Sequence, residues 1–319
     1  MKTMRAVAID RFGGPGVLVV HELPVPKITA QEVLIRVDTA GVGSWDPSIR
    51  SGDWAESKKF PMILGTDGSG IVAEAGKQVR RFKTGDRVYA SAYQNPKGGF
   101  YAEYVAVAAS KVAPIPKPLD MLHAGAVPII GVTALQGVDD TLEIESGERV
   151  IVHGASGDVG MVALQFARQR GARVLAIASG SDGVDFVKRL GADAAIDGKH
   201  DDILAAAREF APDGVDAVLA FAGGKQLTRC LDALRKGGRV AYPNGVEPEP
   251  RKRKGIKMKS YDGVAGVREF ERLNRAIEES DLQVPIAAGF KLEEAADAHR
   301  LIEKGHVLGR IVLRVSLKG

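Results

Sequence analysis

Hydrophobic and polar positions alternate in two different ways along this chain. Up to about residue 120, short apolar runs are separated by Gly, Pro and Asn-Pro, as at 32–39 (EVLIRVDT), 68–74 (GSGIVAE), 86–90 (DRVYA) and 101–107 (YAEYVAV). Runs of this length between turn residues predict β-strands. This part is expected to form an antiparallel, barrel-like or sandwich domain.

From about Leu122 the pattern changes to alternating strands and helices. The predicted strands are 150–153, 173–178, 194–197, 217–221 and 239–242, and the predicted helices are 159–170, 184–190, 203–210 and 225–234. Strands separated by helices at this spacing predict a parallel, doubly wound sheet. After Pro285 the first pattern returns, with a helix at 292–304 and a strand at 310–315, so the second domain is expected to be inserted into the first.

Composition is typical of a globular protein with two domains. The chain has 319 residues, of which 45% are hydrophobic and 26% charged. The net charge of +4 mildly favours anionic ligands but is far from that of a nucleic-acid-binding domain. The lone Cys230 precludes an intrachain disulfide, and the sequence contains neither a signal peptide nor an apolar run long enough to span a membrane. A cytoplasmic protein is the expectation.

The most informative segment is 150–160, VIVHGASGDVG, where an apolar strand meets a glycine-spaced turn and a helix follows. Glycines let the backbone approach a pyrophosphate, and the N-terminus of the following helix attracts its negative charge. The pattern predicts a dinucleotide site whose contacts come from Gly154, Ala155, Ser156, Gly157, Asp158, Val159 and Gly160.

The next predicted strand indicates which dinucleotide binds. NAD sites usually have Asp or Glu at its end, where this chain has Ala178, followed by the hydroxyl residues Ser179 and Ser181. NADPH is therefore expected in preference to NADH. The nearest downstream cation, Lys188, is expected to point into solvent from the predicted helix.

The chain resembles the zinc-independent quinone oxidoreductases of the medium-chain dehydrogenase/reductase superfamily, the group that includes zeta-crystallin. Segments that carry the resemblance include FGGPGVLVV, AGVGSWDPSIRSGDW, ILGTDGSGIV, FKTGDRVY, AVPIIGVTALQG, HGASGDVG, LGADAAID and GHVLGRIVLRV. The resemblance implies an α/β protein with a GroES-like, mostly antiparallel catalytic domain at 1–122 and 286–319 and a Rossmann domain at 123–285. It also implies a homodimer, with NADPH and a small carbonyl substrate bound between the domains.

The resemblance assigns further residues to the cofactor. By position, Thr133 matches a threonine beside the nicotinamide, Ser179 and Ser181 the adenosine phosphate end, and Arg310 a basic residue at the cofactor cleft. Two loops along the nicotinamide side correspond to Phe221, Ala222 and Gly223, and to Asn244. Asp158 and Gly183 are departures, because relatives have a turn glycine and, in many cases, a lysine at these positions.

Zinc is not expected. The related alcohol dehydrogenases bind catalytic zinc through side chains at the positions of Gly43 and Thr66, and zinc needs about three N, S or carboxylate ligands. Without a Lewis acid, hydride transfer to an electrophilic quinone or α,β-unsaturated carbonyl is the favoured chemistry. Asp46, Ser48 and Tyr93 are candidate proton donors, and Trp45 and Trp54 are candidate pocket walls, although each also has an ordinary structural explanation.

Two alternatives remain open at the level of sequence. One is a zinc-free, NADP-dependent alcohol dehydrogenase. The other is a non-catalytic NADPH-binding protein, a sensor or RNA-binding protein, which would use the basic residues of 251–259 in an expected surface loop at 243–259. That loop has no interleaved aromatic residues and is more typical of a solvated surface, so nucleic acid is not the expected partner.

Overall fold

The computed structural model describes residues 2–315; Met1 and residues 316–319, which belong to the first expected domain, lie outside it. The chain forms two compact units. Among the described residues, the first consists of 2–129, 265–279 and 284–315, and the second of 130–264 and 280–283. The second unit is thus inserted into the sequence of the first.

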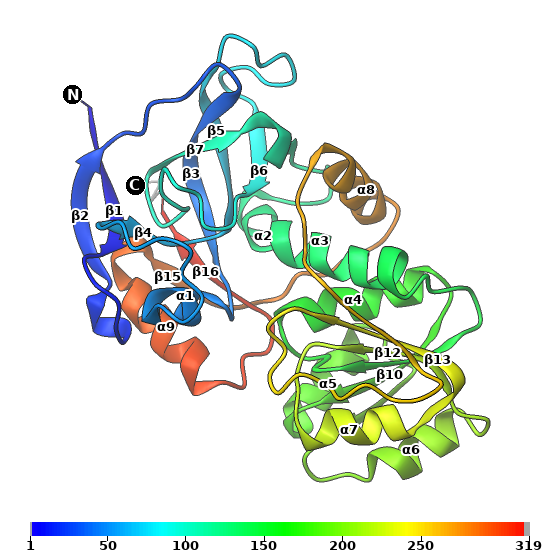
Figure 1. The fold of residues 1–319 in the computed structure, drawn as a ribbon. Helices are drawn as coiled ribbons and strands as arrows, with labels where there is room; N and C mark the ends of the chain where they lie inside the picture. Colours follow the sequence, from blue (N-terminus) through cyan, green and yellow to red (C-terminus); the bar gives the residue numbers. More distant parts are fainter. Residues whose placement is uncertain (1, 316–319) are drawn as a thin grey trace. The chain divides into compact units, whose positions relative to one another are not determined.

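The first unit is built mostly from antiparallel strands (Figure 1). Its strands are β1 (Thr3–Ile9), β2 (Val19–Pro24), β3 (Glu32–Val42), β4 (Met62–Ile63), β5 (Asp67–Ala75), β6 (Arg87–Ser91), β7 (Tyr104–Ala108), β8 (Val112–Pro114), β15 (Ile286–Lys291) and β16 (Arg310–Arg314). Its helices are α1 (Asp46–Ser51), α2 (Met121–Ala126), α8 (Val267–Glu278) and α9 (Ala295–Lys304), with the 3-10 turns η1 (Pro15–Val17), η2 (Ala109–Lys111) and η4 (Leu292–Glu294). One sheet has the order β2-β1-β4 and the other β15-β16-β3-β5-β6-β8, with β7 also paired to β3.

Alternating apolar residues hold this unit together. The central strand β3 turns Val33, Ile35 and Val37 inward, and all three are buried in one core with residues of β1, β5, β6 and β16. The strand predicted at 101–107 begins later in the structure, since β7 starts at Tyr104. Tyr101 lies before this strand, and its side chain is buried in the core.

The second unit contains a parallel sheet with the order β11-β10-β9-β12-β13-β14 (Figure 1). The strands are β9 (Arg149–His153), β10 (Arg173–Ala178), β11 (Ala194–Asp197), β12 (Val215–Ala220), β13 (Leu234–Pro243) and β14 (Lys257–Tyr261). The helices are α4 (Asp158–Gln169), α5 (Gly180–Arg189), α6 (Ile203–Phe210) and α7 (Lys225–Asp232); α3 (Pro128–Leu135) leads into this unit and continues as the π-helical turn η3 (Gln136–Thr141). This confirms the predicted α/β fold class.

Two local expectations were wrong. The helix expected from 184 begins earlier, at Gly180, and Ser179 is its N-cap residue. The surface loop expected at 243–259 ends earlier, since Lys257 and Lys259 belong to β14 and pair in parallel with β13. Between residues 2 and 315, no helix is both long and apolar enough to cross a membrane.

Candidate functional site

Most predicted cofactor residues of the second unit follow the carboxyl ends of its strands, whereas Thr133 lies in α3. Residues 154–160 follow β9, 179–181 follow β10, 221–223 follow β12 and Asn244 follows β13. All of these strands are parallel, so these segments lie along one edge of the sheet. The chain runs from β9 outward to β10 and β11 and then returns to the other side of β9 with β12. Such a reversal of strand order is where open α/β sheets bind ligands.

The turn after β9 needs its glycines. Gly154 has a φ of +76°, and the N–H groups of Gly154 and Ala155 both donate to Ile177 O at 3.1 Å. A Cβ atom on Gly160 would lie 2.2 Å from Gly154 O, so a larger residue cannot bring α4 this close to the turn. A Cβ on Gly157 would meet only Gly154 O at 3.3 Å, which leaves open space above the turn for a ligand.

Asp158 is the first residue of α4 and directly follows Gly157 in the sequence. Its carboxylate accepts a hydrogen bond from the Val159 N–H at 2.8 Å. That interaction favours the helix N-terminus, because an acidic side chain complements the helix dipole. A phosphate at the same place would meet the negative charge of the carboxylate.

Two further groups of predicted residues come together within the second unit. Gly154 packs against Phe221, and a Cβ on Gly223 would lie 2.3 Å from Glu247 O, so this loop fits closely against its neighbours. Elsewhere, Tyr261 Oη donates to Thr133 O at 3.1 Å and Asn244 N donates to Tyr261 O at 2.8 Å. Sequence reasoning did not single out Tyr261, because nothing in its local pattern relates it to α3.

The three candidate proton donors lie in different surroundings in the first unit. Asp46 begins α1 and is 1% exposed, whereas Ser48 on the same helix is half-buried. Tyr93 lies in the loop after β6 and is exposed. Asp46 Oδ2 accepts hydrogen bonds from Gly43 N at 2.9 Å and from Tyr101 Oη at 2.8 Å.

A chain of buried side chains leads to Asp46. Arg50 is a donor only, so its contact with His299 Nδ1 at 3.0 Å leaves the imidazole proton on Nε2. Nε2 faces Tyr101 Oη at 3.2 Å, and this hydroxyl in turn donates to Asp46. Burial raises the pKa of Asp46 to about 6, despite these hydrogen bonds, and lowers the pKa of His299 to about 3, with a contribution from the Arg50 charge.

Arg310 lies on β16 and is completely buried in the first unit. Its guanidinium donates to Asp67 Oδ1 at 2.9 Å and lies 5.3 Å from the centre of the Trp45 ring. Its assignment to a cofactor stays a prediction.

The residues at the zinc-ligand positions do not fit a metal ion. Gly43 has no side-chain donor, and a Cβ there would lie 2.2 Å from the Trp45 indole, which fills the space. The indole N–H also donates to Thr66 Oγ1 at 2.9 Å. Among residues 2–315, no three His, Cys, Asp or Glu side chains are grouped in a way that could hold a metal.

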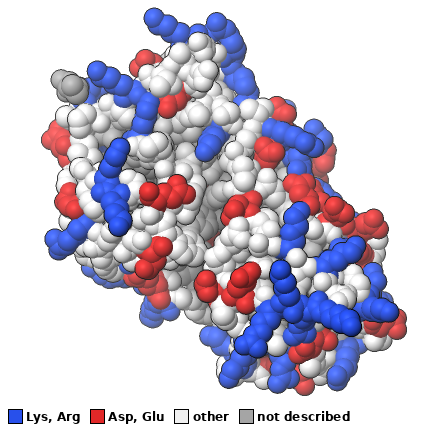
Figure 2. Space-filling model, in the orientation of Figure 1, with Lys and Arg blue, Asp and Glu red and all other residues white. Residues whose placement is uncertain are grey.

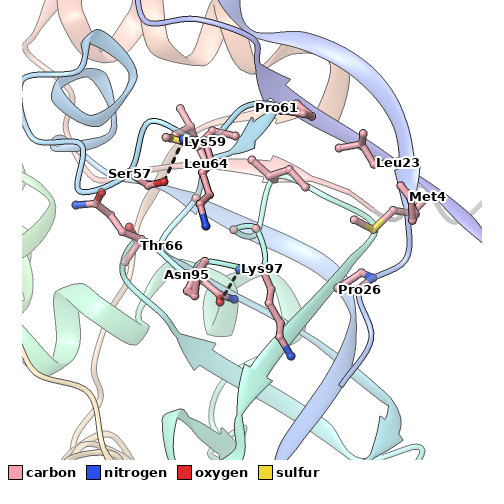
Figure 3. A pocket seen from close by; sticks show the side chains of 18 of the residues that line it. Met4, Leu23, Pro26, Ser57, Lys59, Pro61, Leu64, Thr66, Asn95 and Lys97 are labelled. Carbon is pink, nitrogen blue, oxygen red and sulfur yellow. Dashed lines mark hydrogen bonds between the residues drawn. The ribbon is translucent and has the colours of Figure 1, made fainter. Parts of the chain in front are cut away.

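The first unit also contains a pocket of about 680 Å³ (Figure 3). Its lining includes Ile49, Thr66 and Gln94, which are close in sequence to the three candidate donors, although Asp46, Ser48 and Tyr93 themselves do not line it. Apolar side chains such as Leu23 and Leu64 make up part of the wall, together with Lys59 and Lys97. The pocket could hold a small, partly apolar molecule beside α1.

On the face shown in Figure 2, many Lys and Arg side chains lie over the second unit, with Asp and Glu side chains among them. Exposed members of the basic segment are Arg251, Lys252, Lys254, Lys257 and Lys259, whereas Arg253 forms an ion pair with Asp232. The segment includes the edge strand β14, where exposed lysines are a common protection against unwanted strand pairing.

Two family models match the chain. One, described as the alcohol dehydrogenase GroES-like domain, matches residues 29–117, and the other, described as zinc-binding dehydrogenase, matches 190–313. The chain is 33% identical to the quinone oxidoreductase of Rattus norvegicus over 329 residues, covering 98% of each chain.

Solved structures give the same result. The quinone oxidoreductase of Coxiella burnetii superposes with a TM-score of 0.90 at 32% identity, covering 99% of this chain and 100% of that one. An NAD-dependent alcohol dehydrogenase superposes with a TM-score of 0.91 at 30% identity, covering 98% and 100%. A mycobacterial protein complexed with NADPH has a TM-score of 0.87 at 26% identity, covering 98% and 100%.

Proposed function

Because the chain belongs to the quinone oxidoreductase family of the medium-chain dehydrogenase/reductase superfamily, we propose that it transfers hydride from NADPH to a quinone or an α,β-unsaturated carbonyl without zinc. The observation that carries this proposal is the glycine turn at 154–160, located where the strand order of the parallel sheet reverses. The similarity to a mycobacterial protein complexed with NADPH supports the choice of cofactor. Ala178, which cannot repel a 2′-phosphate, supports it as well.

The residues of the second unit fit a dinucleotide. The backbone of the turn and the N-terminus of α4 would hold the pyrophosphate over Gly157, where the turn is open. Ser179 and Ser181 would contact the adenosine end, and Thr133, Asn244 and residues 221–223 would hold the nicotinamide side. When bound, the reduced nicotinamide supplies a hydride.

The protein would contribute positioning and electrostatic stabilisation to the acceptor. Trp45 occupies the space between Gly43 and Thr66, so the acceptor has to be electrophilic without a metal. Quinones and enones meet this requirement, because conjugation already activates the carbon that receives the hydride. Ser48 or Tyr93 would donate the proton. Asp46 is buried and accepts hydrogen bonds from Tyr101 Oη and Gly43 N, so it would hold the loop at 43–46 in place instead.

Calorimetry and a coupled assay test the proposal. We expect the protein to bind NADPH more tightly than NADH and to consume NADPH with 1,4-benzoquinone, a 2-alkenal or a cyclic enone. A metal chelator should leave these rates unchanged. Binding of NADPH with no turnover of any of these acceptors, or activity lost to the chelator and restored by zinc, would overturn the proposal.

An alcohol dehydrogenase that works without zinc is the second candidate, and the similarity to an NAD-dependent alcohol dehydrogenase favours it. Reduction of NADP by primary or secondary alcohols, at rates above those of enone reduction, would identify this activity. The same assay with NAD separates the two coenzymes.

We also propose that the protein is a homodimer, as implied by the resemblance. Light scattering coupled to gel filtration measures its mass directly, and a mass near 34 kDa, that of one chain, would contradict the proposal.

A further inference from the structure

The pocket of the first unit has largely apolar walls and is long enough to hold an extended molecule. Its volume of about 680 Å³ lies within the range of roughly 300–1,000 Å³ that is usual for small-molecule sites. Figure 3 shows Ser57 and Thr66 on one side of the pocket and Met4, Leu23 and Pro26 on the other. A molecule with an apolar chain therefore fits this space.

The charges around the pocket all have the same sign. Among the described residues that line it, none is Asp or Glu, and three are lysines, Lys27, Lys59 and Lys97. Lys97 is already neutralised, because its Nζ forms an ion pair with Glu32 at 2.5 Å and donates to Lys27 O at 3.0 Å. Lys27 and Lys59 are exposed, and neither side chain forms an ion pair with a described residue. Two cations at the rim of the pocket are thus left without a counter-charge.

Two loops that form the walls are fastened to each other by Gln94. This residue has a φ of +42°, which is uncommon for any residue except glycine. Its side-chain amide donates to Trp54 O at 2.9 Å and accepts a hydrogen bond from Glu56 N at 2.6 Å. The loop at 54–59 is therefore held against the loop at 93–97, and a ligand finds walls that are already in place. Such preorganisation lowers the cost of binding.

The interior of the pocket adjoins the residues proposed to act on the acceptor. Thr66 is 2% exposed, and its hydroxyl accepts the hydrogen bond from the Trp45 indole at 2.9 Å. Ile49, another lining residue, directly follows Ser48 on α1. The buried part of the pocket is thus the place for an electrophilic carbon, and the exposed lysines lie at its rim.

We propose that the physiological acceptor is an anionic amphiphile, an enone or enal with an apolar chain that ends in a carboxylate or phosphate, whose anionic group is bound by Lys27 and Lys59. The inference rests on the proposed function and names its substrate class. The β-carbon of the acceptor receives the hydride of NADPH and the α-carbon receives a proton, which leaves NADP⁺ and the saturated carbonyl compound. The anionic group takes no part in the reaction and serves only for recognition.

Two acceptors of equal length test this inference: a ten-carbon 2-alkenal that ends in a carboxylate, and its methyl ester. For the wild type with NADPH, we expect kcat/KM to be about tenfold higher for the carboxylate, as for one charge-assisted contact. The difference should lie in KM, because the contact is the same in the bound state and in the transition state. It should also shrink as salt increases, because the lysines are exposed.

The double variant Lys27→Ala/Lys59→Ala should lose this preference, while kcat/KM for the methyl ester changes less than about twofold. Lys58→Ala/Lys77→Ala is the matched control, because it removes two exposed charges of the same unit that do not line the pocket. This control should keep the preference. Arginine at both positions 27 and 59 preserves the charge and should preserve the preference as well.

Calorimetry with decanoate and decanol reports on the pocket without turnover, since neither molecule can accept a hydride. We expect decanoate to bind the wild type about tenfold more tightly than decanol. The Lys27→Ala/Lys59→Ala variant should bind the two molecules with equal affinity.

The inference is overturned if the wild type reduces the ester as efficiently as the carboxylate, or if Lys27→Ala/Lys59→Ala keeps the preference. Equal loss of the preference in the control variant would overturn it too. Failure of the proposed function looks different, because neither acceptor would then be reduced. In that case, binding of decanoate that depends on Lys27 and Lys59 supports the ligand class, and binding that does not depend on them contradicts it.

Discussion

Burial is the main cause of the shifted pKa values of several side chains in the first unit. Asp46 and His299 are both ionisable, but Asp46 has a raised pKa and His299 a lowered one, because each loses water on folding. Tyr101 joins them, and its own pKa is raised well above the usual range by burial. The hydrogen bonds that lead from Arg50 to Asp46 fix the orientation of the His299 and Tyr101 rings. The Asp46 carboxylate also accepts a hydrogen bond from the Gly43 N–H.

Removing the carboxylate of Asp158 should tighten cofactor binding. This group lies on the first turn of α4, beside the open turn, and repels a pyrophosphate there. We expect Asp158→Ala to raise the affinity for NADPH about threefold to tenfold, as for one unit charge removed near the protein surface. The helix should lose about 0.3–1 kcal/mol of stability.

Titration calorimetry at low and high salt measures the effect of Asp158. Since the effect is electrostatic, it should shrink as salt increases, and the isosteric Asp158→Asn should behave like the alanine variant. Weaker binding by both variants would mean that the carboxylate organises the turn instead of opposing the ligand.

Secondary-structure elements follow the apolar pattern where that pattern is regular. The strand at 194–197 and the helix at 203–210 have the bounds that the sequence predicts, because alternating or helically spaced apolar residues define both. The start of α5 was missed because Ser and Gly favour turns, yet here Gly180, with a φ of +77°, begins the helix. Strand β14 was missed because exposed lysines conceal a strand that packs on one side only.

The junction of β9 and α4 depends on Gly160. We expect Gly160→Ala to lower the affinity for NADPH more than tenfold and the free energy of unfolding by about 1–3 kcal/mol, since the new Cβ would lie 2.2 Å from Gly154 O. Gly16→Ala is the matched control, because a Cβ there meets nothing within 4 Å. Urea unfolding and calorimetry report the two effects, and equal behaviour of the two variants would contradict the close packing.

Breaking the buried ion pair between Asp67 on β5 and Arg310 on β16 should destabilise the first unit strongly. Both side chains are 0% exposed, so Asp67→Asn removes a negative charge from beside a buried cation. We expect a loss of about 3–5 kcal/mol in urea unfolding, followed by the fluorescence of the adjacent Trp45. Asp297→Asn, which breaks the exposed pair with Arg300, should cost less than about 1 kcal/mol. Similar losses for both would show that Asp67 is not charged in the native protein.

At the scale of the whole molecule, the sequence predicted the two kinds of sheet and the insertion of one unit into the other. Local patterns could not predict contacts between distant segments. Tyr89, for example, donates a hydrogen bond to Asn274, and its ring packs on Phe270 of α8, far along the chain. The Asp46 site likewise combines residues 46, 50, 101 and 299, whose spacing carries no recognisable motif. Sequence named Asp46, but only the fold shows that it is sealed from solvent.

Burial of Asp46 should also be visible in the stability of the molecule against pH. A carboxyl group whose native pKa of about 6 exceeds the ordinary 3.8 binds its proton more tightly in the folded state, so its contribution to stability is present at low pH and is lost as pH rises through 6.

The variant Asp46→Asn has no carboxyl group at this position and cannot titrate there. We therefore expect its unfolding free energy, measured relative to wild type, to improve by about 2.4 kcal/mol between pH 4 and pH 7.5. The buried His153 and His299 act in the opposite direction but are present in both proteins, so they cancel in the difference. Exposed Asp297→Asn serves as the control, and its unfolding free energy relative to wild type should change by less than about 1 kcal/mol over the same pH range. If Asp46→Asn runs parallel to wild type, the carboxyl group titrates normally and the hydrogen bonds from Tyr101 and Gly43 compensate fully for its burial.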